Sequence, residues 1–384
     1  GQRMAKYLKI INLETIPLNN RGMLLRIQTD EGLVGLGSPM NYEHGRTVAQ
    51  AIKDMGEYLI GRDPLQIEDH WQTLFRSSYS RQMPILLSAL SGIEMACWDL
   101  LGKQVGLPVW KLLGGSVRDS IRVYGGAGGA TPEAAAESAR SSVEIGFTAV
   151  KTTPFPQAVR PIETPAEIDR IVNHIAAIRE AIGNSIDLAI DFHRAASPPF
   201  AKMLLRELET FHPIFVEEPT KAMPDNVGPL RELAQSTCIP IATGERCTTR
   251  WGFRELCETK AAAIIQPDIR HCGGIREMRH ISAMAEVHEI LIAPHSAADP
   301  LGIVAAVHAM APTPNFLLME FGGGGGAGFF KEPLSMINGF VQLPQGPGLG
   351  VEIDPDELEK MRQQGTWRQR TMRRHPEDGN FSDF

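Results

Sequence analysis

The feature of this chain that most constrains its fold is a regular alternation of short apolar and longer amphipathic segments after Ile121. Each apolar segment has the length of a strand, and a polar or amphipathic stretch of helical length follows it. Eight candidate strands are found in this way, at residues 121–125, 148–153, 186–193, 213–219, 239–245, 262–268, 289–295 and 315–321. Eight strands alternating with helices predict a βα barrel. A doubly wound sheet is the alternative, but it does not bring so many strand ends to one point.

Polar residues recur at the ends of the third to seventh candidate strands: Asp191, Glu217, Glu245, Asp268 and His295. Their successive spacings are 26, 28, 23 and 27 residues, each about one βα unit. A barrel places catalytic groups at the C-terminal ends of its strands. The sequence therefore predicts that these five side chains meet at one mouth.

The first 120 residues lack this alternation and predict a separate α+β domain. Residues 22–39 read as two strands around the turn signal Asp30-Glu31-Gly32, and helical stretches follow at 46–60, 65–76 and 84–105. We expect three parts, which are an α+β domain over residues 4–120, a barrel over 121–321 and a C-terminal segment over 322–384.

Composition and charge argue against several classes of protein. The hydrophobic share of 43% and the charged share of 22% are ordinary for a globular protein, and the formal net charge of −7 disfavours a nucleic-acid partner. The five cysteines are scattered without a CxxC pair, which disfavours disulfides and structural zinc and favours a reducing cytoplasm. The start of the chain has no apolar signal core, and no run approaches the ~20 apolar residues that cross a bilayer. We therefore expect a cytoplasmic protein without a membrane partner.

Three of the strand-end residues, Asp191, Glu217 and Glu245, are acids on consecutive candidate strands. Neighbouring strands lie about 4.8 Å apart, so these carboxylates can converge and would then raise each other's pKa. A divalent cation relieves that repulsion, and an all-oxygen ligand set favours Mg²⁺ over zinc. The alternative is that each acid pairs separately with a cation of the mouth, such as Arg194 or Arg246. Three acids in register favour the metal.

The histidines of the mouth are candidates for moving protons. Asp268 and His295 end neighbouring strands, and a carboxylate beside an imidazole fixes its tautomer and raises its basicity. Taken alone, His295 could equally be a hydrogen-bonded core histidine. Asp191 and His193 lie two residues apart on one candidate strand, so we expect their side chains to share a face. His193 would then handle a second proton on another side of the substrate.

Other residues near the strand ends have less specific signals. Lys151 can neutralise a substrate carboxylate, or act as a base if desolvated. Glu320 can donate a hydrogen bond to an oxyanion, provided that burial keeps it protonated. Either side chain could instead be solvated. His271 and Cys272, in "DIRHCGG", predict loop packing, with His271 a candidate substrate contact.

The C-terminal segment opens with "GGGGGAG" at residues 322–328. This stretch is not a phosphate loop because no Gly-Lys-Ser/Thr follows it, and we expect a flexible loop at the mouth. The charged tail after Pro355 predicts a solvated or subunit-contacting helix and a loose terminus.

Six motifs on successive strands resemble one known family. "AVKTT", "DFH", "FVEEP", "TGER", "QPD…GG" and "APH" are similar, in order and spacing, to the mandelate racemase branch of the enolase superfamily. The resemblance runs from about residue 6 to about residue 350, and "YLIGRDP" and "SGIEMACWDLLGK" look like that family's capping domain. It implies a modified (β/α)7β TIM barrel, with an α+β cap formed by the N-terminal part and the C-terminal segment.

The resemblance also implies roles for the residues of the mouth. Asp191, Glu217 and Glu245 would be the Mg²⁺ ligands, and the Asp268–His295 pair would be the catalytic dyad. Lys151 and Glu320 would act on the carboxylate side of the substrate.

Within that branch, "DFHR", "IATGER" and "TTRW" are most similar to the D-galactonate dehydratase-like sugar acid dehydratases. There, the equivalent of His193 is the acid that helps a hydroxyl leave, and that of His295 is the base. Racemases of the branch often carry Lys-x-Lys on the second strand, but Thr153 stands here at the second position, which disfavours a two-base racemase. The stretches "SPMNYEHGRT" and "FGGGGGAGFF" also depart from the galactonate enzymes, so the sugar can differ. Tyr42 in the first stretch, together with Arg246, is a candidate substrate contact.

The expected activity is Mg²⁺-dependent dehydration of an acid sugar, a galactonate-like aldonate, to a 2-keto-3-deoxy sugar acid. The alternative is an epimerase or cycloisomerase that acts on a sugar acid or lactone through the same enediolate. Two more distant alternatives are a barrel that binds a sugar acid without turnover, and a phosphosugar aldolase, which would need a Schiff-base lysine and a phosphate loop. We expect a homo-oligomer, either a dimer of dimers or an octamer.

Overall fold

A closed parallel barrel forms the larger part of the protein in the computed structural model, which describes residues 7–19, 22–40, 42–155, 158–221, 223–296, 299–368 and 373–383. Its strands are β4 (Ser120–Gly126), β5 (Ala149–Thr152), β6 (Asp187–Asp191), β7 (Phe215–Glu217), β8 (Ile241–Thr243), β9 (Ile264–Ile265), β10 (Leu291–Ile292) and β11 (Met319–Glu320). Strands β4 to β10 pair in chain order, β11 pairs in parallel with β4, and a bridge from Ile292 to Phe316 completes the circle. The predicted barrel is confirmed, and a doubly wound order is excluded.

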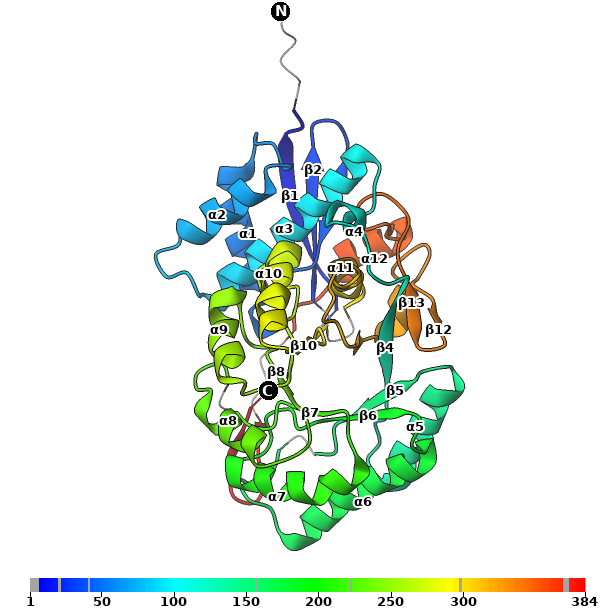
Figure 1. Ribbon diagram of the computed structural model, residues 1–384. Helices are drawn as coiled ribbons and strands as arrows, with labels where there is room; N and C mark the ends of the chain where they lie inside the picture. Colours follow the sequence, from blue (N-terminus) through cyan, green and yellow to red (C-terminus); the bar gives the residue numbers. More distant parts are fainter. Residues whose placement is uncertain are drawn as a thin grey trace, which may run out of the picture.

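Seven helices surround these strands as an outer ring (Figure 1). They are α5 (Pro132–Glu144), α6 (Pro165–Ile182), α7 (Pro198–Leu208), α8 (Gly228–Gln235), α9 (Thr249–Thr259), α10 (Gly274–Val287) and α11 (Pro300–Met310). Four begin with a side-chain cap followed by proline, the capping residues being Thr131, Thr164, Ser197 and Asp299. A capping oxygen satisfies a free N–H group of the first turn, and proline has no N–H group that needs a partner there. The sequence thus marks each of these helix starts locally.

The N-terminal part is an α+β cap, drawn at the top of Figure 1 beside α10 and α11. Its antiparallel sheet contains β1 (Ile10–Pro17), β2 (Met23–Thr29) and β3 (Val34–Gly37). Its helices are α1 (Gly45–Leu59), α2 (Ile67–Arg76), α3 (Pro84–Val105) and α4 (Val109–Leu112), after the short 3-10 turn η1 (Tyr42–His44). The three long helices and the β2–β3 hairpin agree with the sequence prediction, which missed β1.

Helix α3 joins the cap to the barrel. Its close packing on β3 requires glycine, because a Cβ atom on Gly37 would lie 2.1 Å from the carbonyl oxygen of Gly92. On its other side, the Glu94 carboxylate accepts hydrogen bonds of 2.8 Å from the backbone N–H groups of Ile275 and Arg276 in the first turn of α10. A carboxylate at a helix N-terminus is favourable because it meets unpaired N–H groups. The cap is therefore anchored to the barrel beside the strand-end loop that carries Asp268.

Helix α3 also corrects an expectation about membranes. By length and composition, its 22 residues could cross a bilayer, so the prediction that no run approaches this length is wrong. In the structure, 78% of its most apolar window is buried inside the protein. Its apolar surface packs in the core of the cap, which explains its composition.

The segment after β11 packs against both the barrel and the cap. The glycine-rich stretch forms a 3-10 turn, η3 (Gly323–Gly326), where we expected a flexible loop, and Leu334 N–H closes it by donating to Gly325 at 2.8 Å. Strands β12 (Met336–Ile337) and β13 (Phe340–Gln342) follow, and β13 pairs antiparallel with β4. Helix α12 (Pro355–Gln364) packs against β1, and Arg362 forms an ion pair of 2.8 Å with Glu14. The chain ends in the hairpin β14 (Arg373–Arg374) and β15 (Phe381–Ser382), drawn in red beside α8 (Figure 1).

Candidate active site

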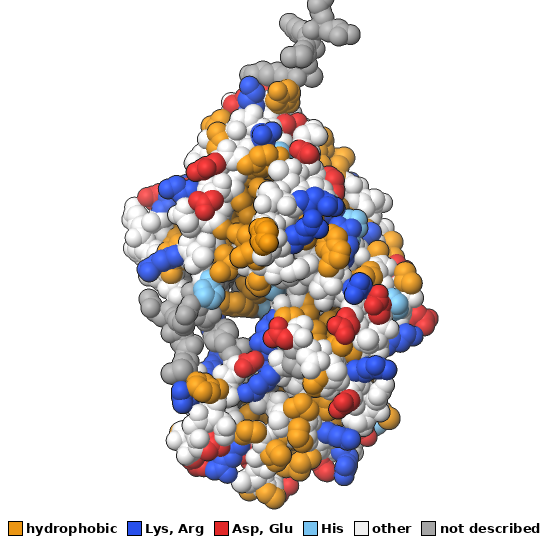
Figure 2. Space-filling view, turned by 90° about the vertical axis from the view of Figure 1, so that its left-hand side faces the viewer, with side chains coloured by type: hydrophobic (Ala, Val, Ile, Leu, Met, Phe, Trp, Pro, Cys, Tyr) orange, Lys and Arg blue, Asp and Glu red, His pale blue; other side chains and the backbone are white. Residues whose placement is uncertain are grey.

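A cavity of about 640 Å³ lies between the cap and the C-terminal ends of the barrel strands. The barrel side contributes His193, Glu245, His271 and His295 to its lining, and the cap side contributes residues around Tyr42. Figure 2 shows a hollow between cap and barrel, with apolar side chains inside it and Lys and Arg side chains along its lower edge. Of the five predicted strand-end residues, Glu245 and His295 thus line this cavity.

Lys151 is at the centre of one group of charges. Its Nζ atom lies 2.6 Å from Glu217 Oε2, 2.7 Å from Glu320 Oε1 and 3.9 Å from Asp191 Oδ2. Asp191 and Glu217 are direct neighbours in the parallel register of β6 and β7, which is why their carboxylates meet. Four of the predicted site residues are therefore brought together by β5, β6, β7 and β11.

The charges of this group act strongly on one another. Burial, and then the neighbouring Glu217 charge, raise the pKa of Asp191 well above its usual range. Burial also raises the pKa of Glu217. Burial acts to lower the pKa of Lys151, but Glu217 and Glu320 outweigh it and raise that pKa overall. Two buried acids in this group thus resist ionisation.

Glu320 does not meet the condition set for it by the sequence argument. Burial acts to raise the pKa of Glu320, but Lys151 and His295 lower it well below the usual range. The carboxylate also accepts a 3.0 Å hydrogen bond from the Ser296 backbone N–H. Glu320 is therefore ionised beside Lys151 in this arrangement, so the protonated state that it would need in order to donate a hydrogen bond to an oxyanion is not present.

Glu245, the third acid, is paired with a cation. Arg194 donates a short hydrogen bond to Glu245 Oε1 and lies 3.5 Å from Glu218 Oε2. Burial would raise the pKa of Glu245, but His295 and Arg194 lower it to about 2. The separate ion pairs considered as the alternative to a metal are therefore present at Glu217, through Lys151, and at Glu245.

The three acids still fit a hard cation by their chemistry. Within the described part of the chain, no three His, Cys, Asp or Glu side chains are arranged as a ready metal centre. However, Glu217 Oε1 is buried and finds no hydrogen-bond partner among the described residues. A buried carboxylate oxygen without a partner is costly, and Mg²⁺ prefers such oxygens. The unpartnered oxygen and the raised pKa values of Asp191 and Glu217 suit these positions for an added cation.

Asp268 and His295 form a hydrogen-bonded pair. His295 Nδ1 lies 2.7 Å from Asp268 Oδ2, and the two residues also form a parallel β-bridge beyond the ends of β9 and β10. Arg270 binds the same carboxylate with two hydrogen bonds, of 2.9 and 2.5 Å. Burial acts to raise the pKa of Asp268, but Arg270 and His295 lower it far below its usual range. Because Asp268 is ionised, it holds the proton on Nδ1 and leaves His295 Nε2 to face Glu245, 3.6 Å away.

His193 reaches the cavity by a route that differs from the predicted one. Strand β6 ends at Asp191, and His193 has a left-handed φ of 47°, so the expectation that both residues share one strand face is wrong. The turn is held by the His193 backbone N–H, which donates to Asp191 Oδ1 at 2.7 Å. Burial and the adjacent Arg194 lower the pKa of His193 to about 4. The imidazole is therefore neutral near pH 7 in this arrangement.

The three predicted substrate contacts, Tyr42, Arg246 and His271, all line the cavity. His271 is buried, and its Nε2 atom lies 2.5 Å from the carbonyl oxygen of Glu245, which orients the ring. Arg246 lies 3.2 Å from Asp383 of the C-terminal hairpin. Cys272, also expected to pack, is buried next to His271.

Sequence reasoning missed two kinds of residue here. Arg270 fixes Asp268, and its position two residues after that acid was the available signal. Arg368 and Arg373 also line the cavity, although they belong to the C-terminal tail. A search for polar residues at the ends of candidate strands could not have found these two arginines, because they lie outside the barrel repeat.

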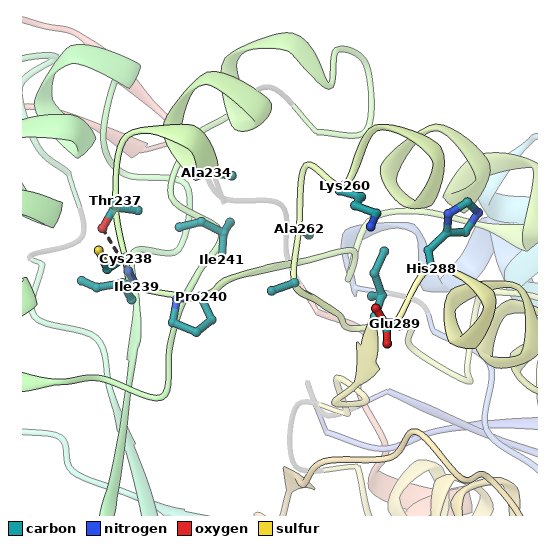
Figure 3. A pocket seen from close by; sticks show the side chains of 12 residues that line it. Ala234, Thr237, Cys238, Ile239, Pro240, Ile241, Lys260, Ala262, His288 and Glu289 are labelled. Carbon is teal, nitrogen blue, oxygen red and sulfur yellow. Dashed lines mark hydrogen bonds between the residues drawn. The ribbon is translucent and has the colours of Figure 1, made fainter.

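A second hollow, of about 440 Å³, lies at the opposite ends of β8, β9 and β10. Figure 3 shows Lys260, His288 and Glu289 on one side of it and Thr237 and Cys238 on the other. These residues precede the strands or end the helices before them, so they belong to the N-terminal face of the barrel. Residues on that face of a barrel usually stabilise the fold and do not take part in catalysis.

A capped parallel barrel with acids and an Asp–His pair at its mouth is the architecture of a barrel enzyme. The chain matches the family described as "Enolase C-terminal domain-like" over residues 134–357. It matches "Mandelate racemase / muconate lactonizing enzyme, N-terminal domain" over residues 15–114. The chain therefore belongs to the enolase superfamily, in the mandelate racemase and muconate lactonizing enzyme group, whose members are enzymes.

Solved structures with similar folds include proteins named as dehydratases. A "putative dehydratase" from Mesorhizobium loti is 32% identical, with 92% of this chain and 98% of that chain covered and a TM-score of 0.86. Another, from Zymomonas mobilis ZM4, is 29% identical, with the same coverage and a TM-score of 0.87. A mandelate racemase/muconate lactonizing enzyme-like protein from Rubrobacter xylanophilus DSM 9941 is 32% identical, with 93% and 98% covered and a TM-score of 0.86.

Proposed function

We propose that this protein is a Mg²⁺-dependent hydro-lyase that dehydrates an acid sugar, a galactonate-like aldonate, to a 2-keto-3-deoxy sugar acid. The observation that carries the proposal is the placement of the Asp268–His295 pair beside Glu245, one of the three acids on β6 to β8 and the loops that follow them. His295 Nε2 faces Glu245 at 3.6 Å, while Asp268 holds Nδ1 at 2.7 Å. A base thus stands beside the carboxylates proposed to hold the cation. The names of the similar structures support the same class of reaction.

Asp191, Glu217 and Glu245 would hold the Mg²⁺ ion. When bound, the ion would stabilise negative charge that develops on the carboxylate oxygens of the substrate. Lys151 lies beside the same acids, so its ammonium group can bind the substrate carboxylate by a charge-assisted hydrogen bond. Glu320 keeps Lys151 in place through the 2.7 Å ion pair.

The protons are assigned to the two histidines. His295 Nε2 removes the C2 proton of the substrate, and Asp268 stabilises the imidazolium that forms. The electron pair of the broken C2–H bond forms the C2–C3 double bond, and the C3–O bond breaks. His193 protonates the leaving hydroxyl, so one water is lost, and the enol product tautomerises to the 2-keto form.

One observation favours the alternative function, an epimerase or cycloisomerase on a sugar acid or lactone. With a pKa of about 4, His193 is neutral near pH 7, and a neutral imidazole is a weak acid for a leaving hydroxyl. Dehydration requires a bound anionic substrate to raise that pKa. An epimerase or cycloisomerase uses the same C2 proton abstraction and does not need a C3 hydroxyl to leave.

A screen against acid sugars separates these functions. Purified protein with Mg²⁺ is incubated with a library of acid sugars, and each reaction is assayed for 2-keto-3-deoxy product and, in D₂O, for deuterium at C2. Dehydration supports the proposal and names the substrate. Exchange without loss of water supports the alternative, and the absence of both reactions across the library contradicts the proposed function.

A further inference from the structure

Gln266 is a buried polar side chain of the barrel to which the proposed function gives no role. Its side chain is buried, with the residue 1% exposed, and neither Nε2 nor Oε1 has a hydrogen-bond partner in the part of the chain that the structure describes. A buried carboxamide that makes no hydrogen bond destabilises the folded protein. Such a group in a native fold therefore needs a physical explanation.

The register of the strands shows that Gln266 points into the barrel. Its backbone N–H donates to the Thr243 carbonyl at 2.9 Å, and the Asp268–His295 bridge continues the β9–β10 register beyond the strand ends. Because side chains alternate along a regular strand, Ile264, Gln266 and Asp268 lie on one face. Ile264 belongs to an apolar cluster with one residue from each strand segment between β6 and β10, which is how side chains fill a barrel. Gln266 thus lies between the barrel core and the Asp–His pair.

Glu217 has the corresponding position on β7. Phe215, two residues before Glu217, belongs to the same apolar cluster as Ile264, two residues before Gln266. Glu217 Oε1 is the buried carboxylate oxygen that accepts no hydrogen bond from the described residues. A carboxamide can both donate and accept hydrogen bonds. Two buried polar groups with unused hydrogen-bonding capacity therefore face the inside of the same barrel.

The strands beside Gln266 supply only small residues at its level. The β8–β9 register places Gly244 next to Gln266, and the β9–β10 register places Ala293 on its other side. Ala242, the neighbour of Glu217 on β8, is also small. Neighbouring strands thus offer neither a polar partner nor a bulky side chain to the carboxamide. Neither Gln266 nor Glu217 lines the 640 Å³ cavity, so Gln266 is a neighbour of the acids rather than a substrate contact.

We propose that Gln266 is a positioning residue of the cation site, which binds a water molecule that the Mg²⁺ ion keeps. This inference rests on the proposed function, which assigns Asp191, Glu217 and Glu245 as ligands of the ion. Mg²⁺ loses its waters reluctantly and usually keeps several of them in a protein site. The hydrogens of such a water need acceptors, and the buried Gln266 carboxamide supplies one. The unsatisfied carboxamide thus lowers the stability of the metal-free protein and gains its hydrogen bonds when the hydrated ion binds.

The variant Gln266→Met tests this role, because Met has a similar length and no amide group. Removing a residue that supports the direct metal ligands typically weakens metal binding by about tenfold to a hundredfold, and calorimetric titration with Mg²⁺ should show this loss. The metal-free variant should unfold at the same or a higher temperature, because it no longer buries an unsatisfied carboxamide. With the substrate found in the screen, saturating Mg²⁺ should restore kcat, since only the affinity for the ion is lowered. Gln266→Leu should behave in the same way.

Ile264→Met is the matched control. It places the same new side chain on the same face of the same strand, two residues earlier, and volume-conserving changes are tolerated in a core. Its affinity for Mg²⁺ should equal that of the unchanged protein. Equal Mg²⁺ affinity in Gln266→Met would overturn the inference. Lower stability of that variant without metal would also overturn it, because the carboxamide would then be satisfied by a structural water only.

The same titration separates failure of this inference from failure of the proposed function. If the unchanged protein does not bind Mg²⁺, the proposed cation site is wrong, and the proposed function fails with it. If the unchanged protein binds Mg²⁺ and Gln266→Met binds it equally well, only the role of Gln266 is overturned. A kcat that stays low in Gln266→Met at saturating Mg²⁺ would also overturn a role exerted through the affinity for the ion.

Discussion

The two sides of the mouth differ in how well their charges are satisfied. On the β9–β10 side, Asp268 accepts hydrogen bonds from Arg270 and from His295, and its pKa is far below normal. On the β6–β7 side, Asp191 and Glu217 share one lysine, their pKa values are raised, and Glu217 Oε1 has no hydrogen-bond partner among the described residues. The hydrogen-bonding groups of the Asp268 carboxylate are satisfied on the β9–β10 side. The acids on the β6–β7 side carry more negative charge, when ionised, than Lys151 alone neutralises.

This difference indicates two kinds of function. A fully hydrogen-bonded Asp–His pair is preorganised, so its imidazole needs to lose a proton, but not to move, before it can act as a base. A group of acids with excess negative charge gains stability when a cation arrives. The account therefore predicts that substitutions on the two sides disable the protein in different ways.

The largest effect is expected for Glu217→Gln, which removes a buried proposed ligand. Because that carboxylate would bind the metal, the variant should lose Mg²⁺ binding, and turnover should fall by about a thousandfold or more. Calorimetric titration with Mg²⁺ and product assays measure the two effects. Glu207→Gln, on the exposed face of α7, is the control and should change neither. Unchanged Mg²⁺ affinity in the Glu217 variant would show that the acid side is only an ion-pair network.

A somewhat smaller loss of activity is expected for His295→Asn, on the β9–β10 side of the mouth. Removal of a general base should lower kcat by about a hundredfold to ten-thousandfold and stop deuterium exchange at C2, because exchange needs the same base. Mg²⁺ affinity should remain, since the proposed ligands are untouched. His288→Asn is the control, because His288 lines the hollow at the other end of the barrel (Figure 3). Persisting C2 exchange would assign the base elsewhere.

Mg²⁺ should stabilise the fold more at pH 8 than at pH 5. Burial and neighbouring carboxylates, which are Glu217 for Asp191 and Glu320 for Glu217, raise the folded-state pKa values of both acids above their unfolded values. The stability that their protonation gives is therefore present at low pH and is lost as pH rises through the folded-state pKa. Only the ionised acids bind the metal, so saturating Mg²⁺ should add about 2.7 kcal/mol at a hundredfold excess over Kd when both are ionised. Equal shifts of the unfolding temperature at both pH values would contradict this account.

The smallest effect is a shift of the pH profile in Glu320→Gln. Burial acts to lower the pKa of His295, but Glu245 and Glu320 raise it overall. The base must be neutral to accept a proton, so activity falls as pH falls through this pKa. Removing the Glu320 charge should lower that pKa and move the acidic limb of kcat/KM to lower pH. A limb that stays in place, or moves to higher pH, would mean that a group other than His295 controls it.

The barrel and most of the site were predictable because they follow a local repeat. Each apolar strand is followed by a helix, and the next polar residue marks the strand end, so Glu217, Glu245, Asp268 and His295 were found by counting. Strand β1 was missed because its sequence, "IINLETIP", does not alternate regularly between apolar and polar residues, and only Ile10 and Ile16 of this strand are fully buried. The backbone at His193 could not be predicted, because alternation within a strand assumes that the strand continues.

Interactions between distant parts of the chain could not be predicted from the sequence. The pairing of Arg194 with Glu245 depends on where two side chains from different loops lie in space. The β14–β15 hairpin lies outside the barrel repeat, so no pattern in the sequence predicts that Arg373 lines the cavity or that Arg160 and Arg246 pair with this hairpin. Sequence patterns within one element do not contain this information.

The most direct test of the central claim, that two histidines divide the proton transfers, is the variant His193→Asn with the substrate found in the screen. In D₂O with Mg²⁺, the account predicts deuterium at C2 at a rate close to that of the unchanged protein, with the formation of 2-keto-3-deoxy product abolished. Loss of both exchange and product in a variant that still binds Mg²⁺ would contradict the division of roles between His193 and His295.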